Sequence, residues 1–226
     1  MLAFENGTSI LHRNSRSLVF MKMFYKVLNR LRDRLAWIPC LLTGRFFRAV
    51  RETRGTSAPI SWRIFWRQKI CGRNLGAPWP VSPDSIVGNP EKIKIGVGCA
   101  PGLGPWCYIQ GANGIEIGDY TLVAPRVSII SANHDVHDIH THVAANPVKI
   151  GRYCWLGINS TILPEVEIGD HTVVAAGAVV TKSFPDGYCV LAGVPAKIVK
   201  RLDAEKVVER RNRVEYIGYR RVGKSD

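Results

Sequence analysis

The sequence has few acidic residues, few methionines and no closely spaced cysteines. It contains 18 Asp and Glu against 31 Lys and Arg, and 3 Met among 226 residues. Its 6 Cys include no CxxC pair, and the chain is too large for a disulfide-stapled scaffold, so we interpret them as reduced, mostly buried residues. The longest charge-free run, residues 95–115, holds six Gly and two Pro and therefore does not form a plain membrane-spanning helix. The N-terminus has no secretory layout either, so we expect a cytoplasmic protein, free or peripherally bound to the membrane.

The net charge of +13 is concentrated at the ends of the chain. Residues 1–80 carry 15 basic and 3 acidic side chains, residues 81–200 carry 8 and 10, and residues 201–226 carry 8 and 5. A nucleic-acid-binding domain would hold its positive charge on the folded core. Because the central half is slightly acidic, we expect no nucleic-acid partner.

Aliphatic residues recur every six positions through the central half. They are Ile117, Val123, Ile129, Ile150, Leu156, Ile162, Ile168, Val174 and Val180. A small residue lies two positions before most of them, as in Thr121, Cys154, Ser160, Thr172 and Ala178. An α-helix would scatter this pattern around its surface, because six residues turn it by about 600°. The alternative is a parallel α/β domain with short strands, but no helical period separates the strands.

The geometry that fits is a coil with three short flat faces and about 18 residues per turn. The aliphatic residues point inward, and the small residues fit where the interior narrows. Glycine follows the aliphatic residue at Gly118, Gly151, Gly157 and Gly169, where we expect corner backbone angles that bulkier residues resist. Residues 86–196 would give about six turns.

Three segments carry a family resemblance: residues 147–164, residues 168–182 and the run Ala192–Lys197. They resemble the hexapeptide-repeat acyltransferases, and within them the maltose, galactoside and colanic-acid type O-acetyltransferases. The resemblance implies an all-β solenoid, a left-handed parallel β-helix, which is an exception to the right-handed crossover rule. It also implies a homotrimer whose active sites lie between neighbouring subunits.

We divide the chain into a basic, partly helical N-terminal extension (residues 1–80), the β-helix (residues 81–201) and a C-terminal helix with a tail (residues 202–226). Residues 18–38 predict an amphipathic basic helix, either adsorbed to anionic membrane or packed against the protein. Residues 203–216 predict a short helix with Asp203 as its N-cap, packed back on the coil.

The six-residue period breaks between Ile129 and Ile150, which are 21 residues apart, three more than three repeats. The interruption contains four of the six histidines of the chain. Acetyl transfer to a hydroxyl needs a base near neutrality, and imidazole suits that task. The resemblance places this base on His134, with direct transfer and no acyl-enzyme. Exposed backbone N–H groups at a corner would stabilise the oxyanion.

The acceptor is expected to be a sugar hydroxyl, small or lipid-linked, in bacterial polysaccharide biosynthesis. The residues that we expect on the acceptor side are Trp106, Tyr108, Asn133, Asp135, His137 and Trp155. The family usually has Asn at the position of Trp106, and an indole stacks on a sugar face but accepts no hydrogen bond from it.

Acetyl-CoA is the donor that the resemblance implies. The pantetheine arm needs small side chains beside it, as at Gly157, Ala176 and Gly177. Thr181 and Lys182 match the family's contacts to the nucleotide end, and Lys197 or Lys200 would meet its phosphates.

Three alternatives stay open. One is a sugar or xenobiotic N-acetyltransferase of the same fold, since one histidine serves both reactions. Another is a hydratase like the γ-class carbonic anhydrases, because His137 and His142 have the spacing of their metal ligands. The upstream third ligand has no counterpart in the coil, so we expect no metal. The last is a coil that only scaffolds partners.

Overall fold

The computed structural model describes residues 44–223 and, before them, residues 23–25, 27, 28, 31, 35 and 38. The chain forms two separately packed units, Met1–Gly44 and Arg45–Asp226. In the first unit the described residues between 23 and 38 are all helical and exposed, as the helix predicted over residues 18–38 requires, and Gly44 lies in a turn. Its Lys and Arg side chains lie outside the described residues. Within the described parts of the chain, no helix has the length and apolarity needed to cross a membrane.

The second unit is built mainly from fourteen short strands, and all but the last pair in parallel with their neighbours. They are β1 (Ile86–Gly88), β2 (Ile93–Ile95), β3 (Tyr108–Gln110), β4 (Ile115–Ile117), β5 (Leu122–Val123), β6 (Ser128–Ile130), β7 (Val148–Ile150), β8 (Trp155–Leu156), β9 (Thr161–Ile162), β10 (Glu167–Ile168), β11 (Val173–Val174), β12 (Val179–Val180), β13 (Cys189–Gly193) and β14 (Ala196–Arg201). They form three sheets: face A with the order β1-β3-β6-β9-β12, face B with β2-β4-β7-β10, and face C with β5-β8-β11-β13-β14.

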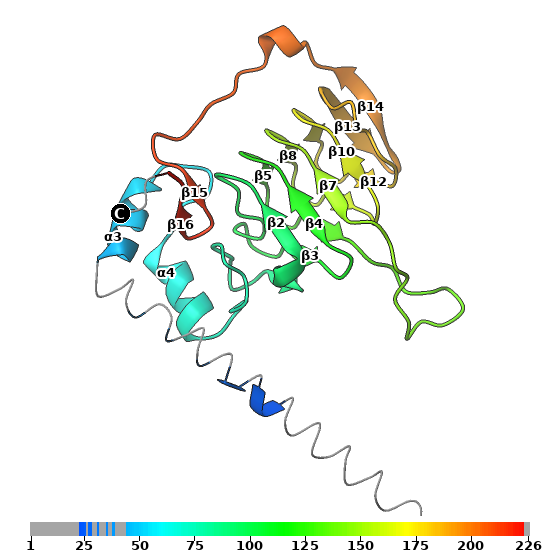
Figure 1. Cartoon of the computed structure of the whole chain (residues 1–226). Helices are drawn as coiled ribbons and strands as arrows, with labels where there is room; N and C mark the ends of the chain where they lie inside the picture. Colours follow the sequence, from blue (N-terminus) through cyan, green and yellow to red (C-terminus); the bar gives the residue numbers. More distant parts are fainter. Residues whose placement is uncertain are drawn as a thin grey trace, which may run out of the picture. The chain divides into compact units, whose positions relative to one another are not determined.

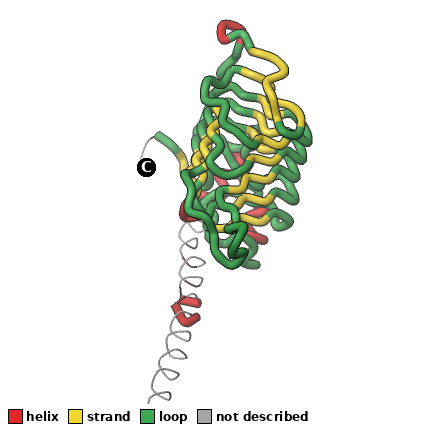
Figure 2. Tube along the Cα trace, turned by 90° about the vertical axis from the view of Figure 1, so that its right-hand side faces the viewer, coloured by secondary structure: helices red, strands yellow, loops and turns green. Residues whose placement is uncertain are grey.

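From β3 to β12 the chain visits faces A, B and C in turn and adds one strand to each as it winds, whereas the first circuit has no strand on face C and the last has none on face B (Figures 1 and 2). The later circuits keep the predicted period, because Thr161 pairs with Val179, 18 residues further on. The first circuits are longer: Ile86 pairs with Tyr108 and Tyr108 with Ser128. With five strands on face A, the coil has about five circuits instead of the six expected.

The interior of the coil confirms the predicted repeat. The repeated aliphatic residues from Ile129 to Val180 are 3% exposed or less, and the small residues at the narrow positions are 1% exposed or less. Each circuit therefore stacks its aliphatic side chains on those of the next, and burial of such a side chain contributes about 1.5–3 kcal/mol.

The corner glycines have a different role from the one expected. Gly118, Gly151 and Gly169 do not adopt positive φ. A Cβ on Gly151 would lie 2.5 Å from the amide nitrogen of Asp170 in the next circuit, and one on Gly118 would lie 2.7 Å from that of Arg152. Glycine is therefore required because successive circuits touch backbone to backbone, and not because of its backbone angles.

Positive φ occurs at other corner positions. Where face B turns into face C (the BC corner), it falls on Tyr120, Tyr153, His171 and Tyr188. Their rings stack in a column, with centroid distances of 5.2, 5.2 and 4.9 Å. Ring stacking between circuits is consistent with a backbone conformation that non-glycine residues rarely adopt.

Helices close the N-terminal end of the coil. These are α3 (Arg45–Glu52), α4 (Trp62–Phe65) and the π-helical turn η1 (Trp66–Ile70), which we call the helical base; η2 (Pro90–Lys92) is a single 3-10 turn. Below the first circuit, the buried Trp79 joins the coil's core and donates a hydrogen bond to the carbonyl of Pro101 at 2.8 Å. Gln68 of the base donates to the carbonyl of Trp79 at 2.8 Å. Residues 45–80, assigned to the extension from sequence, thus pack with the coil.

The prediction of a C-terminal helix over residues 203–216 was wrong. Asp203 does cap a helix, but it is the single 3-10 turn η3 (Ala204–Lys206). Residues 207–215, the C-terminal strap, then run without helix beside the BC corner to the hairpin of β15 (Tyr216–Ile217) and β16 (Arg220–Arg221) (Figure 1). The strap carries Glu209 and Glu215, which bind His171 at 3.1 Å and the Tyr120 hydroxyl at 2.5 Å. The C-terminal segment therefore packs back on the coil as expected, but in an extended form.

Gly151→Ala is expected to destabilise the coil by about 3 kcal/mol or more, because its Cβ would meet backbone that cannot move without disturbing the next circuit. Urea unfolding followed by circular dichroism measures the loss. The matched control is Gly88→Ala, whose Cβ would lie 4.0 Å from its nearest neighbour, the carbonyl oxygen of Ile109. An equal effect at both positions would contradict the close-approach explanation.

Candidate active site

The histidine-rich interruption is a long excursion from the coil between faces A and B. Ile129 pairs with Ile162, 33 residues further on, so this circuit is about fifteen residues longer than the regular 18. The expected insertion of three residues was therefore too small. The excursion (residues 131–147) leaves the coil at the corner between faces A and B, the AB corner, and Figure 1 shows it standing off the strands.

Two side chains of the preceding circuit hold the root of the excursion. Gln110 accepts hydrogen bonds from the amides of Ser131 at 3.0 Å and Ala132 at 2.9 Å. Asn113 donates from its side-chain nitrogen to the carbonyls of Ser131 at 3.0 Å and Val143 at 2.9 Å, and so joins the two arms of the loop. These contacts fix where the loop leaves the coil.

His134 lies on the outgoing arm, exposed, opposite His142 on the returning arm. The two residues form an antiparallel backbone bridge, and their ring centroids are 4.3 Å apart. The flanking hydrogen bonds join Asp135 to Thr141 at 2.8 Å and Val143 to Asn133 at 2.9 Å. His134 is therefore on a short two-stranded arm and not on a freely hanging loop.

The carboxylates of the excursion shape its tip. Asp135 accepts hydrogen bonds from the amides of His137 at 2.7 Å and Asp138 at 3.2 Å. Asp138 accepts from the hydroxyl of Thr141 at 2.6 Å and from the amide of His140 at 3.1 Å, and these bonds lower its pKa. Both carboxylates thus stabilise turns of the loop by accepting hydrogen bonds from it, and His137 lies on the exposed tip beside them.

The small residues predicted for the donor lie at the corner between faces C and A, the CA corner. Ala176 and Gly177 are exposed there, and nothing lies within 4 Å of a Cβ built on Gly177. Gly157 occupies the same corner one circuit earlier. A Cβ on Gly157 would lie 2.8 Å from the amide nitrogen of Ala176. Trp155, 53% exposed, stands on face C two residues before that corner.

Trp106 belongs to the same CA corner in an earlier circuit. Its side chain is 60% exposed, and the guanidinium carbon of Arg126 lies 5.2 Å from its ring centroid. Tyr108, 42% exposed, follows it on the outer side of face A.

The cationic residues predicted for the donor are divided between two places. Thr181 and Lys182 follow β12 at the AB corner, where the Lys182 ammonium lies 5.7 Å from the ring centroid of Phe184. Lys197 and Lys200 are exposed on β14, the edge strand of face C. Among residues 44–223, none of these three lysines has a carboxylate within ion-pair distance.

One chain does not bring the predicted site together. His134 lies at the AB corner and Ala176 at the CA corner, and the whole width of face A separates them. Tyr108 is on face A between the two corners, whereas Trp155 is on face C. His134 and the small corner thus lie on opposite sides of face A within one chain.

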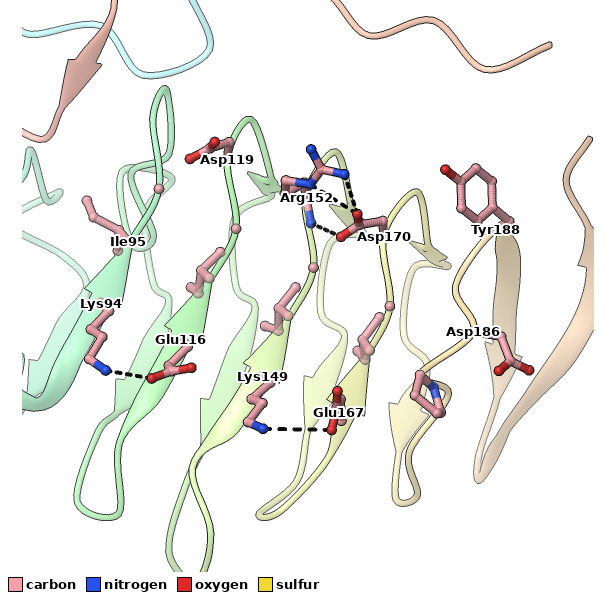
Figure 3. Close-up of a pocket in the computed structure, with 18 residues that line it drawn as sticks. Lys94, Ile95, Glu116, Asp119, Lys149, Arg152, Glu167, Asp170, Asp186 and Tyr188 are labelled. Atoms are coloured by element: carbon pink, nitrogen blue, oxygen red, sulfur yellow. Dashed lines mark hydrogen bonds and ion pairs between the residues drawn. The ribbon is translucent and has the colours of Figure 1, made fainter. Parts of the chain in front are cut away.

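A groove of about 800 Å³ runs elsewhere, along face B and the BC corner (Figure 3). None of the residues predicted for the site lines it. Its side chains pair across the circuits: Lys94 with Glu116 at 2.7 Å, Lys149 with Glu167 at 4.0 Å and Arg152 with Asp170 at 2.8 Å. These pairs follow the strand register and give face B an alternating charged surface.

The buried cysteines of the coil are poor nucleophiles. Burial raises the pKa of Cys154 to about 11 and that of Cys99 to about 12, so both thiols stay protonated near neutral pH. Four of the five described cysteines are buried and all five are free, as the sequence predicts.

Within residues 44–223, no three His, Cys, Asp or Glu side chains are grouped so as to hold a metal ion. His171, the histidine downstream of the excursion, is 6% exposed in the stacked column of the BC corner. It therefore lies on a different corner of the coil from His134.

The sequence interpretation missed the residues that support His134. No part beside His134 was expected for His142 from the sequence, because the pairing of the two histidines depends on how the loop folds. Asn113 and Gln110 belong to no motif, and their role appears only when the preceding circuit is placed beside the loop.

Comparison with known proteins places the chain in a family. The family model described as bacterial transferase hexapeptide (six repeats) matches residues 147–182. WbbJ of Escherichia coli strain K12, named provisionally as a lipopolysaccharide biosynthesis O-acetyl transferase, is 32% identical over 187 residues, which cover 71% of this chain and 90% of WbbJ. Galactoside O-acetyltransferase of the same strain is 36% identical over 92 residues, which cover 39% of this chain and 45% of that protein, so the chain matches about half its length.

Among solved structures, a maltose O-acetyltransferase from Clostridium difficile 630 is similar at 24% identity with a TM-score of 0.48, covering 70% of this chain and 85% of that one. The repeat and the relatives together define an enzyme of the acyltransferase class. More narrowly, the chain belongs to the hexapeptide-repeat acetyltransferase family.

Iodoacetamide at pH 8 is expected to alkylate the exposed Cys71 and to leave Cys99 and Cys154 unmodified. Both of these thiols are buried, and burial raises their pKa so that they stay protonated at this pH. Peptide mapping by mass spectrometry of the folded protein measures this. The same treatment in denaturant, which should label all of them, is the control. Modification of Cys154 in the folded protein at the rate of Cys71 would contradict the assignment.

Proposed function

We propose that this chain transfers the acetyl group of acetyl-CoA to a sugar hydroxyl, with His134 as general base. The observation that carries the proposal is the excursion of residues 131–147, which lengthens its circuit by about fifteen residues and presents His134 outside the coil in a member of an acetyltransferase family. A base that faces a cleft between copies can reach an acceptor hydroxyl, whereas a histidine inside the coil cannot. We also infer that the coil is left-handed, as the family resemblance implies.

The described residues fit the proposed donor. The exposed Ala176 and Gly177 leave main-chain groups open to an extended, amide-bearing arm. Lys197 and Lys200 offer cations for phosphates, and no described carboxylate neutralises them. The thioester supplies an activated acyl carbon, so no cysteine or serine nucleophile of the chain is needed.

His134 takes the proton of the acceptor hydroxyl as the oxygen bonds to the acyl carbon, and it returns this proton to the sulfur that leaves. His142 packs against the His134 ring and holds it on the arm. Exposed backbone N–H groups at the CA corner stabilise the developing oxyanion. Trp155 and Trp106 cover the cleft, and both carry more than half of their surface exposed in the single chain.

We propose a homotrimer, because the site needs the AB corner of one copy beside the CA corner of the next. Repeated three times, this contact turns face A of every copy toward a common axis. The outward residues of face A are uncharged: Ile86, Tyr108, Ser128, Thr161 and Val179. Face B, with its Lys and Glu ladder, then faces solvent. Depletion of charge on face A is what the centre of an interface requires.

The acceptor class follows from the relatives. WbbJ is named for lipopolysaccharide biosynthesis, and galactoside O-acetyltransferase for a sugar. We therefore propose a small or lipid-linked sugar in polysaccharide assembly as the acceptor, with Asn133, Asp135 and His137 of the excursion near it.

We also propose that residues 18–38 contact the membrane: their described apolar side chains, among them Phe24, Leu31 and Ile38, are exposed on a helix.

His134→Ala is expected to lower kcat by about 10²- to 10⁴-fold and to leave the KM for acetyl-CoA nearly unchanged, because the base acts on the acceptor and lies outside the coil. Thiol release measured over a panel of simple, nucleotide-linked and lipid-linked sugars identifies the acceptor and gives both constants. The control is His140→Ala at the exposed loop tip. Undiminished turnover of His134→Ala would remove this residue from the base role.

Thr161→Arg is expected to dissociate the trimer and abolish transfer, because it places a charge on β9, an inner strand of the uncharged face A. Light scattering coupled to size-exclusion chromatography gives the mass. Lys149→Arg puts the same side chain on face B and should leave both mass and activity unchanged. A monomeric wild type, or an intact trimer of Thr161→Arg, would show that face A is not the interface.

A further inference from the structure

The helical base exposes three aromatic rings in a row. Phe47 of α3 is 60% exposed, and Trp62 and Trp66 at the start of α4 and of η1 are 45% and 46% exposed. The Trp62 ring stacks on Phe47 at 6.2 Å and lies 5.6 Å from Trp66. Below them Phe46 and Phe65 are buried, so the row is held on a rigid support.

Two arginines border these rings. Arg63 and Arg67 line a groove of about 470 Å³ together with Trp62 and Trp66. Both arginines are exposed, and neither has a carboxylate partner within residues 44–223. The single acid in residues 45–80 is Glu52, against eight Lys and Arg. Glu52 already binds the Tyr216 hydroxyl at 2.6 Å and Arg221 at 3.5 Å. The surface is therefore aromatic and positive.

Such a surface fits the headgroup region of an anionic bilayer. Indole rings prefer the interface between hydrocarbon and water, and guanidinium groups bind phosphate oxygens in a fixed geometry. A positive patch beside the rings is attracted to anionic lipid, and this attraction weakens as the salt concentration rises. A second protein with an apolar groove would satisfy the rings but leave the arginines without partners.

We propose that Phe47, Trp62, Trp66, Arg63 and Arg67 form a lipid-contact surface by which the base of the coil docks on an anionic membrane. This surface belongs to the folded second unit and is distinct from the membrane contact proposed for residues 18–38. In the proposed trimer, cyclic symmetry would present three bases on one side, and three weak contacts would act together. The docking itself does not depend on acyl transfer.

The first test is co-sedimentation of the full chain with phosphatidylcholine vesicles that contain phosphatidylglycerol. Arg63→Glu with Arg67→Glu is expected to lower vesicle affinity by about tenfold or more, because each cation near an anionic surface contributes about fivefold. Arg210→Glu with Arg211→Glu makes the same change of charge on the exposed strap and should cost less than about twofold. Equal losses in the two variants would show unspecific attraction and overturn the proposal.

The second test needs no charge reversal. In a Trp37→Phe background, which removes the indole of residues 1–44, brominated lipid should quench fluorescence, and Trp62→Phe with Trp66→Phe should remove most of that quenching. Phenylalanine keeps the ring packing of the base. No quenching in the Trp37→Phe protein would overturn the proposal, and so would lipid-independent pairing of trimers through this surface. His134→Ala should bind vesicles as the wild type does, which separates this result from the proposed reaction.

Discussion

Backbone contact between successive circuits governs the structure. At Gly118, Gly151 and Gly169 one circuit touches the next so closely that no side chain fits between them. The contact fixes the spacing of the strands and therefore places equivalent residues of each circuit in columns. The aliphatic core, the charged ladder of face B and the stacked rings of the BC corner are three such columns. Extra residues can enter only where a corner lets the chain leave the coil.

This constraint explains how much of the fold could be predicted. The period of six in residues such as Ile150, Leu156 and Ile162 arises because these side chains stack inside the coil. The small residues Thr121 and Thr172 lie where the interior of the coil narrows. The length of the excursion could not be counted in the same way. The spacing between Ile129 and Ile150 exceeds a whole number of repeats by only three residues, so the sequence does not show that two further repeats belong to the loop. Residues 203–216, with Asp203 as an N-cap, also predicted a C-terminal helix, but Glu209 and Glu215 bind the column of rings at the BC corner and hold the segment extended.

The candidate site shows a similar division. His134, Ala176 and Lys197 stand out in the sequence because their types and motifs match a known chemistry. Their arrangement depends on which corner each one occupies, and that is set by the order in which the chain visits the faces. The supports of the loop, Gln110 and Asn113, are tied to it through tertiary contacts from an earlier circuit. No local pattern distinguishes them from other polar residues.

A stack of circuits, each touching only its neighbours, would normally fray from its ends. The C-terminal strap changes this connectivity. It starts beyond the last circuit, is fastened at His171 and Tyr120 along the way, and ends in a hairpin whose Tyr216 binds Glu52 across 164 residues of sequence. The final circuits cannot loosen without pulling on the base, and the base cannot open without releasing the strap. The strap thereby links the two ends of the solenoid, and we expect this unit to unfold more cooperatively than a stack whose ends are free.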